Sequence, residues 1–563
     1  MYELTESQKA RHAIREFKTI TDALALRGFY RPSGKFGKTL ESCLKNLSPE
    51  IYGSMNDPRV VELKGLEYVI DRLPRGIEAC TKIILTEENP PENSAFEKIE
   101  PLKRRRTSYR ISTQEICMVI SRGISEIYDI LTHMTFLFSE AKKIHARMKD
   151  DSDTLSIEWN ALKHTVEHLD ELDDTQLDQA LWNLSILLGR SYQETKDTFT
   201  YLEEGKQRSG SNNGLFSLIF SLGNLIENEM LSRENALVIY LQPSLMNIIG
   251  QQRYGRVWAD DIRAKLLSMD LLKRPIHIIS ANLHSIVNLM YGFAAIDKSK
   301  SMSIEDDLYQ FIHQIRTVSE EIKAYGETHG LTTVRDRSGT HIDCQIIDSA
   351  QFESLPFHPE ISIAVPESGQ EKPVIIVMDY AFGAQAFELM ENLLKPVTDA
   401  ETTVHLNIQS ISIMGKAGIL TGKKGDIMLA TAHVFEGTSD NYIFENDLHA
   451  DAFDTTVGVY TGPMVTVLGT SLQNRDVLHK FMEDWKTVGL EMEGGHYQRA
   501  ISAAIIKGNI SKDITLRYAY YGSDNPLMSG HTLAAGAMGE EGVKPTYMIT
   551  KVLLEKIFYS VIV

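Results

Sequence analysis

The stretch Gly489-Leu490-Glu491-Met492-Glu493-Gly494-Gly495-His496 places two acidic residues between a short apolar run and a helical pattern. Val488 to Met492 has the composition of a buried strand, and Gly495 to Ile506 has the apolar spacing of a helix. One carboxylate at such a junction is typical of a helix cap. A second carboxylate beside a methionine is also suited to hold a ribose diol, because it accepts two hydrogen bonds while the thioether packs on the sugar.

Short β-rich runs alternate with helical stretches on both sides of this segment. Beyond about residue 340 the runs are His341 to Ile347, Pro373 to Met378, Ile408 to Met414, Ile427 to Ala432, Met464 to Leu468 and Ile514 to Tyr521. Helical spacing lies between several of them, as in Asn474 to Lys486. We therefore predict an α/β domain over residues 340–563, with a mainly parallel twisted sheet in a three-layer αβα arrangement. In such a fold ligands bind at the carboxyl ends of the strands.

Residues 1–335 have a different pattern, and we predict a mainly α-helical region. Apolar residues recur there at intervals of three and four, as in Ile116, Val119, Ile120, Ile124, Ile127 and Ile130. Ile276 to Ile279 is a candidate short strand inside this half. The Gly-, Ser- and Asn-rich stretch from Ser209 to Gly214 is a candidate sub-boundary.

Charge and composition exclude several classes of partner. The 563 residues carry a formal net charge of −18, which argues against a bulk electrostatic grip on nucleic acid or an anionic membrane. The chain lacks an apolar run of the ~18–20 residues that a membrane span needs, and its first residues do not resemble a signal peptide. The four cysteines have no CxxC spacing, which favours buried, reduced thiols. We expect a cytoplasmic protein.

A glycine-rich segment, Met414-Gly415-Lys416-Ala417-Gly418, follows one predicted strand. Glycines at a strand end let backbone N–H groups approach an anion or a sugar, and Lys416 adds a positive charge. A plain tight turn explains the same residues about as well.

The segment Tyr520-Tyr521-Gly522-Ser523-Asp524-Asn525-Pro526-Leu527 ends the last predicted strand. An Asp-Asn-Pro turn is one interpretation. The other is that Asp524 gives a proton to a leaving purine, because departure of the base leaves negative charge on its ring.

Together these segments resemble the purine nucleoside phosphorylase/nucleosidase superfamily, with strands that end in EME and in SD and a GxxG loop. The SD-x-P-L pattern at Ser523 to Leu527 is similar to that of AMP nucleosidases, which also carry a separate N-terminal domain. The resemblance implies that Asp524 assists the leaving base, that Met492 and Glu493 bind ribose, and that Gly415, Lys416 and Gly418 form the substrate or phosphate loop. Asp379 and Gly383 occupy the place of the first active-site loop.

Two departures from the superfamily pattern concern the nucleophile. Phosphorylases of the hexameric type carry an arginine where this chain has Ile413, and nucleosidases of the adenosylhomocysteine type use a glutamate that Asp379 and Glu388 bracket without matching. Hydrolysis is therefore favoured over phosphorolysis. Lys416 keeps inorganic phosphate open as a co-substrate, and no other cofactor is expected. The resemblance also implies a homo-oligomer that acts on a purine nucleoside or nucleotide.

Three other interpretations compete with a nucleoside-cleaving enzyme. In the first, the α/β domain binds a nucleoside without cleaving it and signals through the helical region. In the second, His164 and His168, in the order HxxEH, hold zinc, but the segment has the composition of a solvated helix face and chance matches are expected. In the third, the Lys103 to Arg106 run binds nucleic acid, although a solvated loop is more consistent with so acidic a chain.

Overall fold

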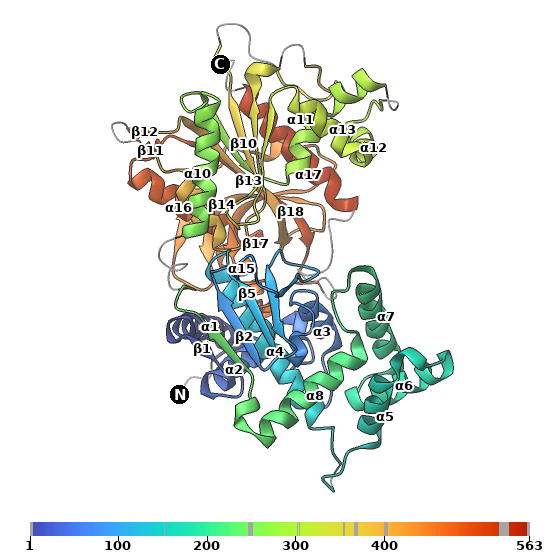
Figure 1. Ribbon diagram of the computed structural model, residues 1–563. Helices are drawn as coiled ribbons and strands as arrows, with labels where there is room; N and C mark the ends of the chain where they lie inside the picture. Colours follow the sequence, from blue (N-terminus) through green and yellow to red (C-terminus); the bar gives the residue numbers. More distant parts are fainter. Residues whose placement is uncertain are drawn as a thin grey trace. The chain divides into compact units, whose positions relative to one another are not determined.

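The computed structural model describes residues 4–150, 152–245, 252–300, 302, 304–352, 355–364, 370–398, 403–528 and 540–559. The chain divides into two compact units (Figure 1). Unit 1 comprises Met1–Gln251 and Gly469–Val477, and unit 2 comprises Gln252–Leu468 and Leu478–Val563. The boundary predicted at residues 335–340 is therefore wrong. The strand over Ile276–Ser280 is hydrogen bonded inside the sheet of unit 2, so the chain that leads to it belongs to that unit.

Unit 2 is built on a ten-stranded sheet. Its strands are β7 (Ile276–Ser280), β8 (Leu331–Val334), β9 (Cys344–Asp348), β10 (Val374–Met378), β13 (Ile408–Ile419), β14 (Ile427–Phe435), β15 (Asn441–Ile443), β16 (Val459–Thr466), β17 (Gly489–Glu491) and β18 (Thr515–Asp524). The short pair β11 (Val397–Thr398) and β12 (Thr403–Val404) lies apart from it. The runs predicted beyond residue 340 are thus all strands.

Five of these strands close into a ring. β13 pairs with β18 and β17, β18 pairs with β14, β14 pairs with β16, and β16 pairs with β17. From β13 the sheet continues through β7, β10, β9 and β8. The mainly parallel sheet that we predicted is instead mixed. β14 runs opposite to β18, β17 runs opposite to β13, and β9 and the edge strands β8 and β15 pair antiparallel with their neighbours.

Helices cover both faces of this sheet, which confirms the three-layer arrangement. α10 (Arg253–Ser268), α14 (Gln385–Leu393) and α16 (Gly494–Ile506) share one buried apolar cluster with the sheet. α11 (Leu283–Ser299), α12 (Leu308–Ile315), α13 (Ser319–Glu327) and α17 (Val543–Tyr559) share another. Figure 1 shows α10 and α16 on one side of the strands and α11 and α17 on the other. Alternate residues of β10 contribute to the two clusters, as the period of a strand requires.

Unit 1 contains a six-stranded sheet that the sequence pattern did not indicate. Its order is β1 (Phe29–Tyr30), β6 (Val238–Leu241), β2 (Lys82–Thr86), β5 (Glu115–Val119), β4 (Ser108–Ser112) and β3 (Glu97–Ile99). The helices are α1 (Glu6–Arg27), α2 (Lys35–Leu47), α3 (Leu63–Ile70), α4 (Ile124–His145), α5 (Ile157–Glu167), α6 (Asp174–Leu188), α7 (Tyr192–Ser209) and α8 (Leu215–Leu231). α15 (Arg475–Trp485) begins in unit 1 and ends in unit 2.

The predicted helical spacing over residues 116–130 spans two different elements. Ile116 and Val119 belong to β5, whereas Ile124, Ile127 and Ile130 belong to α4. A buried strand that runs almost directly into a buried helix produces apolar residues at mixed intervals, so the periodicity by itself did not separate them.

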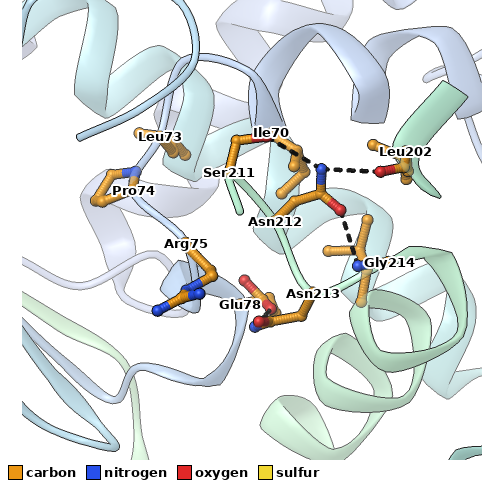
Figure 2. A pocket seen from close by; sticks show the side chains of 11 residues that line it. Ile70, Leu73, Pro74, Arg75, Glu78, Leu202, Ser211, Asn212, Asn213 and Gly214 are labelled. Atoms are coloured by element: carbon orange, nitrogen blue, oxygen red, sulfur yellow. Dashed lines mark hydrogen bonds between the residues drawn. The ribbon is translucent and has the colours of Figure 1, made fainter. Parts of the chain in front are cut away.

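The stretch from Ser209 to Gly214 is an ordered connection inside unit 1 and not a sub-boundary (Figure 2). The Asn212 side-chain amide donates to the Leu202 carbonyl at 3.1 Å, and its oxygen accepts from the Gly214 N–H at 2.8 Å. Asn213 donates to the carboxyl of Glu78 at 2.7 Å. Burial raises the pKa of Glu78. The asparagines thus satisfy buried groups, which is why a polar segment stays inside a packed unit.

The Lys103 to Arg106 run is a loop, as we expected, but its last residue is not solvated. Arg106 is 1% exposed and lies 3.0 Å from Glu126 and 2.9 Å from Asp129, two carboxylates on α4. Lys103 lies 2.8 Å from Asp71. Tertiary packing against α4 buries Arg106, because the helix supplies the opposite charges, whereas Lys103 and Arg104 are half-buried and Arg105 is exposed.

We predict that Arg106→Met lowers the free energy of unfolding by about 3–5 kcal/mol, because it removes from two buried carboxylates, Glu126 and Asp129, the guanidinium that lies nearest to both. Chemical denaturation of the full chain measures the change. Arg59→Met is the matched control, since the Arg59 side chain is 83% exposed and pairs only with a neighbouring aspartate in the described part of the chain. Equal effects of the two substitutions would show that the Arg106 pairs do not hold unit 1 together.

Candidate functional site

The carboxyl ends of four parallel strands of unit 2 meet at one edge of the sheet. β7 pairs in parallel with β10 and β13, and β13 pairs in parallel with β18. Gly418 of β13 is opposite Asp524 of β18 on one side and opposite Leu490 of β17 on the other. The glycine segment, Met414–Gly418, therefore lies between the EME segment, Gly489–His496, and the SD segment, Tyr520–Leu527, which are distant in sequence.

Gly415, Lys416 and Gly418 form part of β13 and not the loop that we predicted. Residues 415–418 pair with Tyr520–Asp524, so their backbone groups take part in a strand ladder. The register shifts between Ala417 and Gly418, and a glycine at such an irregularity is typical of a bulge. Lys416 is exposed on this strand. The long pairing partner β18 explains the correction, because it extends β13 past the predicted turn.

Glu491, the first acid of the EME segment, is a helix cap. Its buried carboxylate accepts from the N–H groups of Glu493 at 2.6 Å and of Gly494, at the start of α16. The Thr466 hydroxyl donates to the same carboxylate, and His433 Nδ1 lies 3.3 Å from Oε1. Burial by itself raises the pKa of Glu491, but His433 and these hydrogen bonds outweigh burial and lower it.

Glu493, the second acid, connects two segments of the predicted site. Its Oε1 accepts a hydrogen bond from the Gly383 N–H at 2.8 Å. Gly383 lies in the turn after β10 and has a φ of 54°, which favours glycine. The hydrogen bond brings Gly383, which we predicted in the first active-site loop, and the EME segment together at the same edge of the sheet. Met492, which precedes Glu493, is 8% exposed.

Asp524 is the last residue of β18 and is 5% exposed. Ser523 Oγ donates to its Oδ1 at 2.5 Å. The turn that follows is made by Asn525, whose side chain accepts from the Leu527 N–H at 3.0 Å and donates to the Gly422 carbonyl at 3.0 Å. The turn therefore depends on Asn525, and Asp524 stays at the strand end.

Asp379, Glu388 and Ile413, which we compared with the superfamily residues that activate water or hold phosphate, differ in their surroundings. Asp379 follows β10, and its Oδ1 accepts from the Tyr380 N–H at 2.8 Å. Ile413 is buried in an apolar core cluster. Glu388 lies on α14, where burial, with a smaller contribution from Glu391, raises its pKa to about 8.

Two aromatic residues that were not singled out from the sequence lie next to Glu491. His433 of β14 is fully buried and stacks on Phe444, with ring centroids 5.3 Å apart. Tyr520 is 4% exposed, and its hydroxyl has no hydrogen-bond partner in the described part of the chain. A Cβ on Gly494 would meet both rings. Tyr520 belongs to a segment that the sequence had marked, whereas His433 gave no signal inside an otherwise apolar strand.

Other features of the chain bear on the remaining expectations. His164 and His168 stack at 4.4 Å on α5 and its cap, and no cluster of three or more His, Cys, Asp or Glu suited to a metal occurs among the described residues. The four cysteines are buried and unpaired, which confirms the expected core thiols. Of the helices that the structure describes, none has the length and apolarity of a membrane span.

Comparison with known proteins assigns the chain to a family. The model of the "Family of unknown function (DUF6909)" matches residues 38–313 and 306–559, so the chain belongs to that family. No curated protein matches the chain. Among solved structures, 5′-methylthioadenosine/S-adenosyl homocysteine nucleosidase from Campylobacter jejuni is 11% identical, with 51% of this chain and 99% of that chain covered and a TM-score of 0.30. Futalosine hydrolase from Helicobacter pylori is 11% identical, with 50% of this chain and 98% of that chain covered and a TM-score of 0.27. Purine nucleoside phosphorylase from Toxoplasma gondii is 13% identical, with 51% of this chain and 93% of that chain covered and a TM-score of 0.27. TM-scores this low establish neither a common fold nor a common function.

Two glycines at this edge are expected to respond differently to alanine. A Cβ on Gly415 would make ordinary contacts, 3.6 Å from Tyr380 and 4.0 Å from Tyr520, whereas a Cβ on Gly494 would overlap Tyr520 and His433. Gly415→Ala should change the free energy of unfolding by no more than about 1 kcal/mol, and Gly494→Ala should lower it by about 1–3 kcal/mol. Urea denaturation measures both. Equal losses would contradict the difference in room for a Cβ at Gly415 and Gly494.

The Glu491 cap makes a pH-dependent contribution to stability. Because the folded-state pKa lies below the ordinary value of 4.5, ionised Glu491 stabilises the fold above that value, and this contribution is lost as pH falls through the lowered pKa. Glu491→Gln should cost about 1–3 kcal/mol near pH 7 and less in acid. Denaturation across a pH series measures this, with Glu483→Gln at an exposed position as the control. A deficit that is constant with pH would contradict the assignment.

Proposed function

We propose that this member of the DUF6909 family cleaves the N-glycosidic bond of a purine nucleoside or nucleotide. The observation that carries the proposal is the double pairing of Gly418 with Leu490 and Asp524. This pairing supports the proposal because the segment that contains Glu493 and the strand that ends at Asp524 flank the same strand, at the sheet edge where α/β folds bind ligands.

Glu493 is the group that we assign to the ribose. Of the two EME acids, Glu491 is committed to capping α16, so its oxygens are engaged by backbone N–H groups. Glu493 is only partly buried, and the Gly383 N–H fixes its orientation. A carboxylate has about four lone-pair positions, so it accepts the ribose hydroxyls in addition to that N–H. The neighbouring Met492 thioether supplies an apolar contact for the sugar.

Asp524 is the group that we assign to the leaving base. As the C–N bond breaks, its electron pair moves to the base and the ribosyl carbon gains oxocarbenium character. A protonated Asp524 gives its proton to the base, and the incoming nucleophile then bonds to the ribosyl carbon. Such general acid help contributes typically about 10²- to 10⁴-fold, and stabilisation of the separated charges supplies the rest.

Water is the favoured nucleophile. The position where hexameric phosphorylases carry an arginine is Ile413, which is buried in the core, so a cation is absent from that point of the strand. Lys416 is the exposed cation of β13 and would hold inorganic phosphate if the reaction were phosphorolysis. The proposal requires no other cofactor. Release of ribose or ribose phosphate without added phosphate identifies hydrolysis, and ribose 1-phosphate formed only with phosphate identifies a phosphorylase.

We predict that the purified full chain releases free base from at least one of adenosine, inosine, AMP and methylthioadenosine, as measured by chromatography with and without phosphate. Asp524→Asn should lower kcat by about 10²- to 10⁴-fold because it removes the proton donor. Glu493→Gln should lower kcat/KM because it weakens the grip on ribose. Asp513→Asn and Glu483→Gln, at exposed positions, are the matched controls.

Two results would overturn the enzymatic assignment. The first is the absence of turnover together with equal nucleoside binding by the wild-type chain and Asp524→Asn, which would identify a binding module. The second is turnover that neither Asp524→Asn nor Glu493→Gln changes, which would place the chemistry elsewhere.

A further inference from the structure

Unit 1 has a carboxyl edge of its own, formed by β2 and β5. These strands are parallel, with Thr86 opposite Val119, and β5 leads through Gly123 into the first turn of α4. β4 is antiparallel to β5, with Ser108 opposite Met118, so Arg106 lies at the same edge. The edge therefore combines the ends of parallel strands with the N-terminus of a long helix, where α/β folds bind ligands.

Four arginines gather at this edge around two carboxylates of α4. Arg106 lies 3.0 Å from Glu126 and 2.9 Å from Asp129. Arg104 lies 3.3 Å from Asp129, and Arg122 lies 3.4 Å from Glu126. Although burial by itself raises the pKa values of both carboxyls, the arginines, with His133 at Asp129, outweigh it and hold both pKa values low. Two carboxylates are thus shared among three guanidinium groups.

The fourth arginine, Arg72, has no carboxylate partner among the described residues. Its side chain is buried, at 5% exposure for the residue, and its Nη1 donates to the Tyr68 carbonyl at 2.8 Å. The guanidinium carbon lies 3.4 Å from the centroid of the Tyr68 ring. Its Nε has no hydrogen-bond partner in the described part of the chain. Burial, with Arg104 nearby, lowers the pKa of Arg72 and outweighs the opposite contributions of Tyr68, Asp129 and Asp71.

The helix N-terminus itself is already occupied. Glu126 Oε2 accepts from the N–H groups of Ser121 at 3.2 Å and Arg122 at 3.3 Å, as an external anion does at such a position. Hydroxyl donors lie on the side of Arg72 instead. The Tyr68 hydroxyl is 2.6 Å from Thr470 Oγ1, which is also 3.5 Å from Arg104. Arg104 has a φ of 101°, an uncommon backbone conformation that is found most often at functional sites.

A buried guanidinium without a direct ion pair is costly, and natural proteins bury charges paired or against a ligand. We propose that Arg72, Arg104 and the hydroxyls of Tyr68 and Thr470 form a phosphate-binding site in unit 1. The ligand is either inorganic phosphate or the phosphate of a monoester. Planar guanidinium groups match phosphate oxygens geometrically, and hydroxyl donors complete the shell. The site consists of unit 1 residues only and does not rest on the proposed function.

Thermal unfolding of the full chain tests this proposal. Inorganic phosphate and ribose 5-phosphate are added separately, against potassium chloride at matched ionic strength, and calorimetric titration supplies the Kd. The wild-type chain should show a higher Tm with at least one of the two anions than with chloride. The anion that gives the larger shift distinguishes free phosphate from a monoester. Arg72→Met should weaken binding by about tenfold or more, because a charge-assisted hydrogen bond is lost, while Arg59→Met should bind as the wild type does.

Arg104→Met provides a second test if Arg72→Met does not fold, and it should also weaken binding. Asp524→Asn should bind the anion with unchanged Kd, so failure of the catalytic assignment in unit 2 stays distinguishable from failure of this site. The proposal is overturned if neither anion raises the Tm of the wild type above the chloride control. It is also overturned if both arginine variants bind as tightly as the wild type, or if Asp524→Asn abolishes binding.

Discussion

Hydrogen bonding along both edges of β13 is the constraint on which the rest of unit 2 depends. Its first half pairs with β7 and carries the open sheet, while its second half pairs with β17 and closes the ring. Because β18 pairs along most of β13, the ends of all three strands have a set relative register. The relative position of Leu490 and Asp524 is therefore a property of the strand ladder, which suits a site that needs groups in a defined geometry.

The two acids of the EME segment show how one short stretch supplies both structure and chemistry. Glu491 is buried and receives backbone N–H groups, so it terminates β17 and begins α16. Glu493 is two residues further on, outside the strand, and is oriented by the turn after β10. His433 stabilises the first acid from β14, a strand on the far side of the ring. Glu491 therefore connects the five-stranded ring, through His433, to the backbone of Glu493.

Unit 1 follows a different physical principle at its sheet edge. Most of α4 is buried, yet it presents Glu126 and Asp129 to arginines from separate segments of the chain. Buried ion pairs of this kind contribute little net stability, but losing one partner is costly. The cluster therefore specifies how these segments pack on α4. Arg72 is the member that forms no ion pair with a carboxylate among the described residues.

The sequence by itself determined the elements of unit 2 and the segments of its candidate site. Strand and helix periods differ, so alternation beyond residue 340 predicted both the strands and the three layers. It did not predict that the sheet is mixed, because strand direction depends on pairing partners that are distant in sequence. For the same reason it placed Gly415–Gly418 in a loop, whereas β18 extends β13 through these residues.

In unit 1 more of the fold depended on tertiary contacts than in unit 2, and less could be predicted from the sequence. β5 and α4 adjoin so closely that their apolar residues merged into one apparent period, and the unit boundary moved because Ile276–Ser280 pairs inside the other sheet. The same holds for charge. A run of basic residues indicates a solvated surface unless opposite charges from elsewhere cover it, and only folding brings Glu126 and Asp129 onto Arg106. Residue types determined which chemistry is possible in this protein, and long-range pairing decided where it is placed.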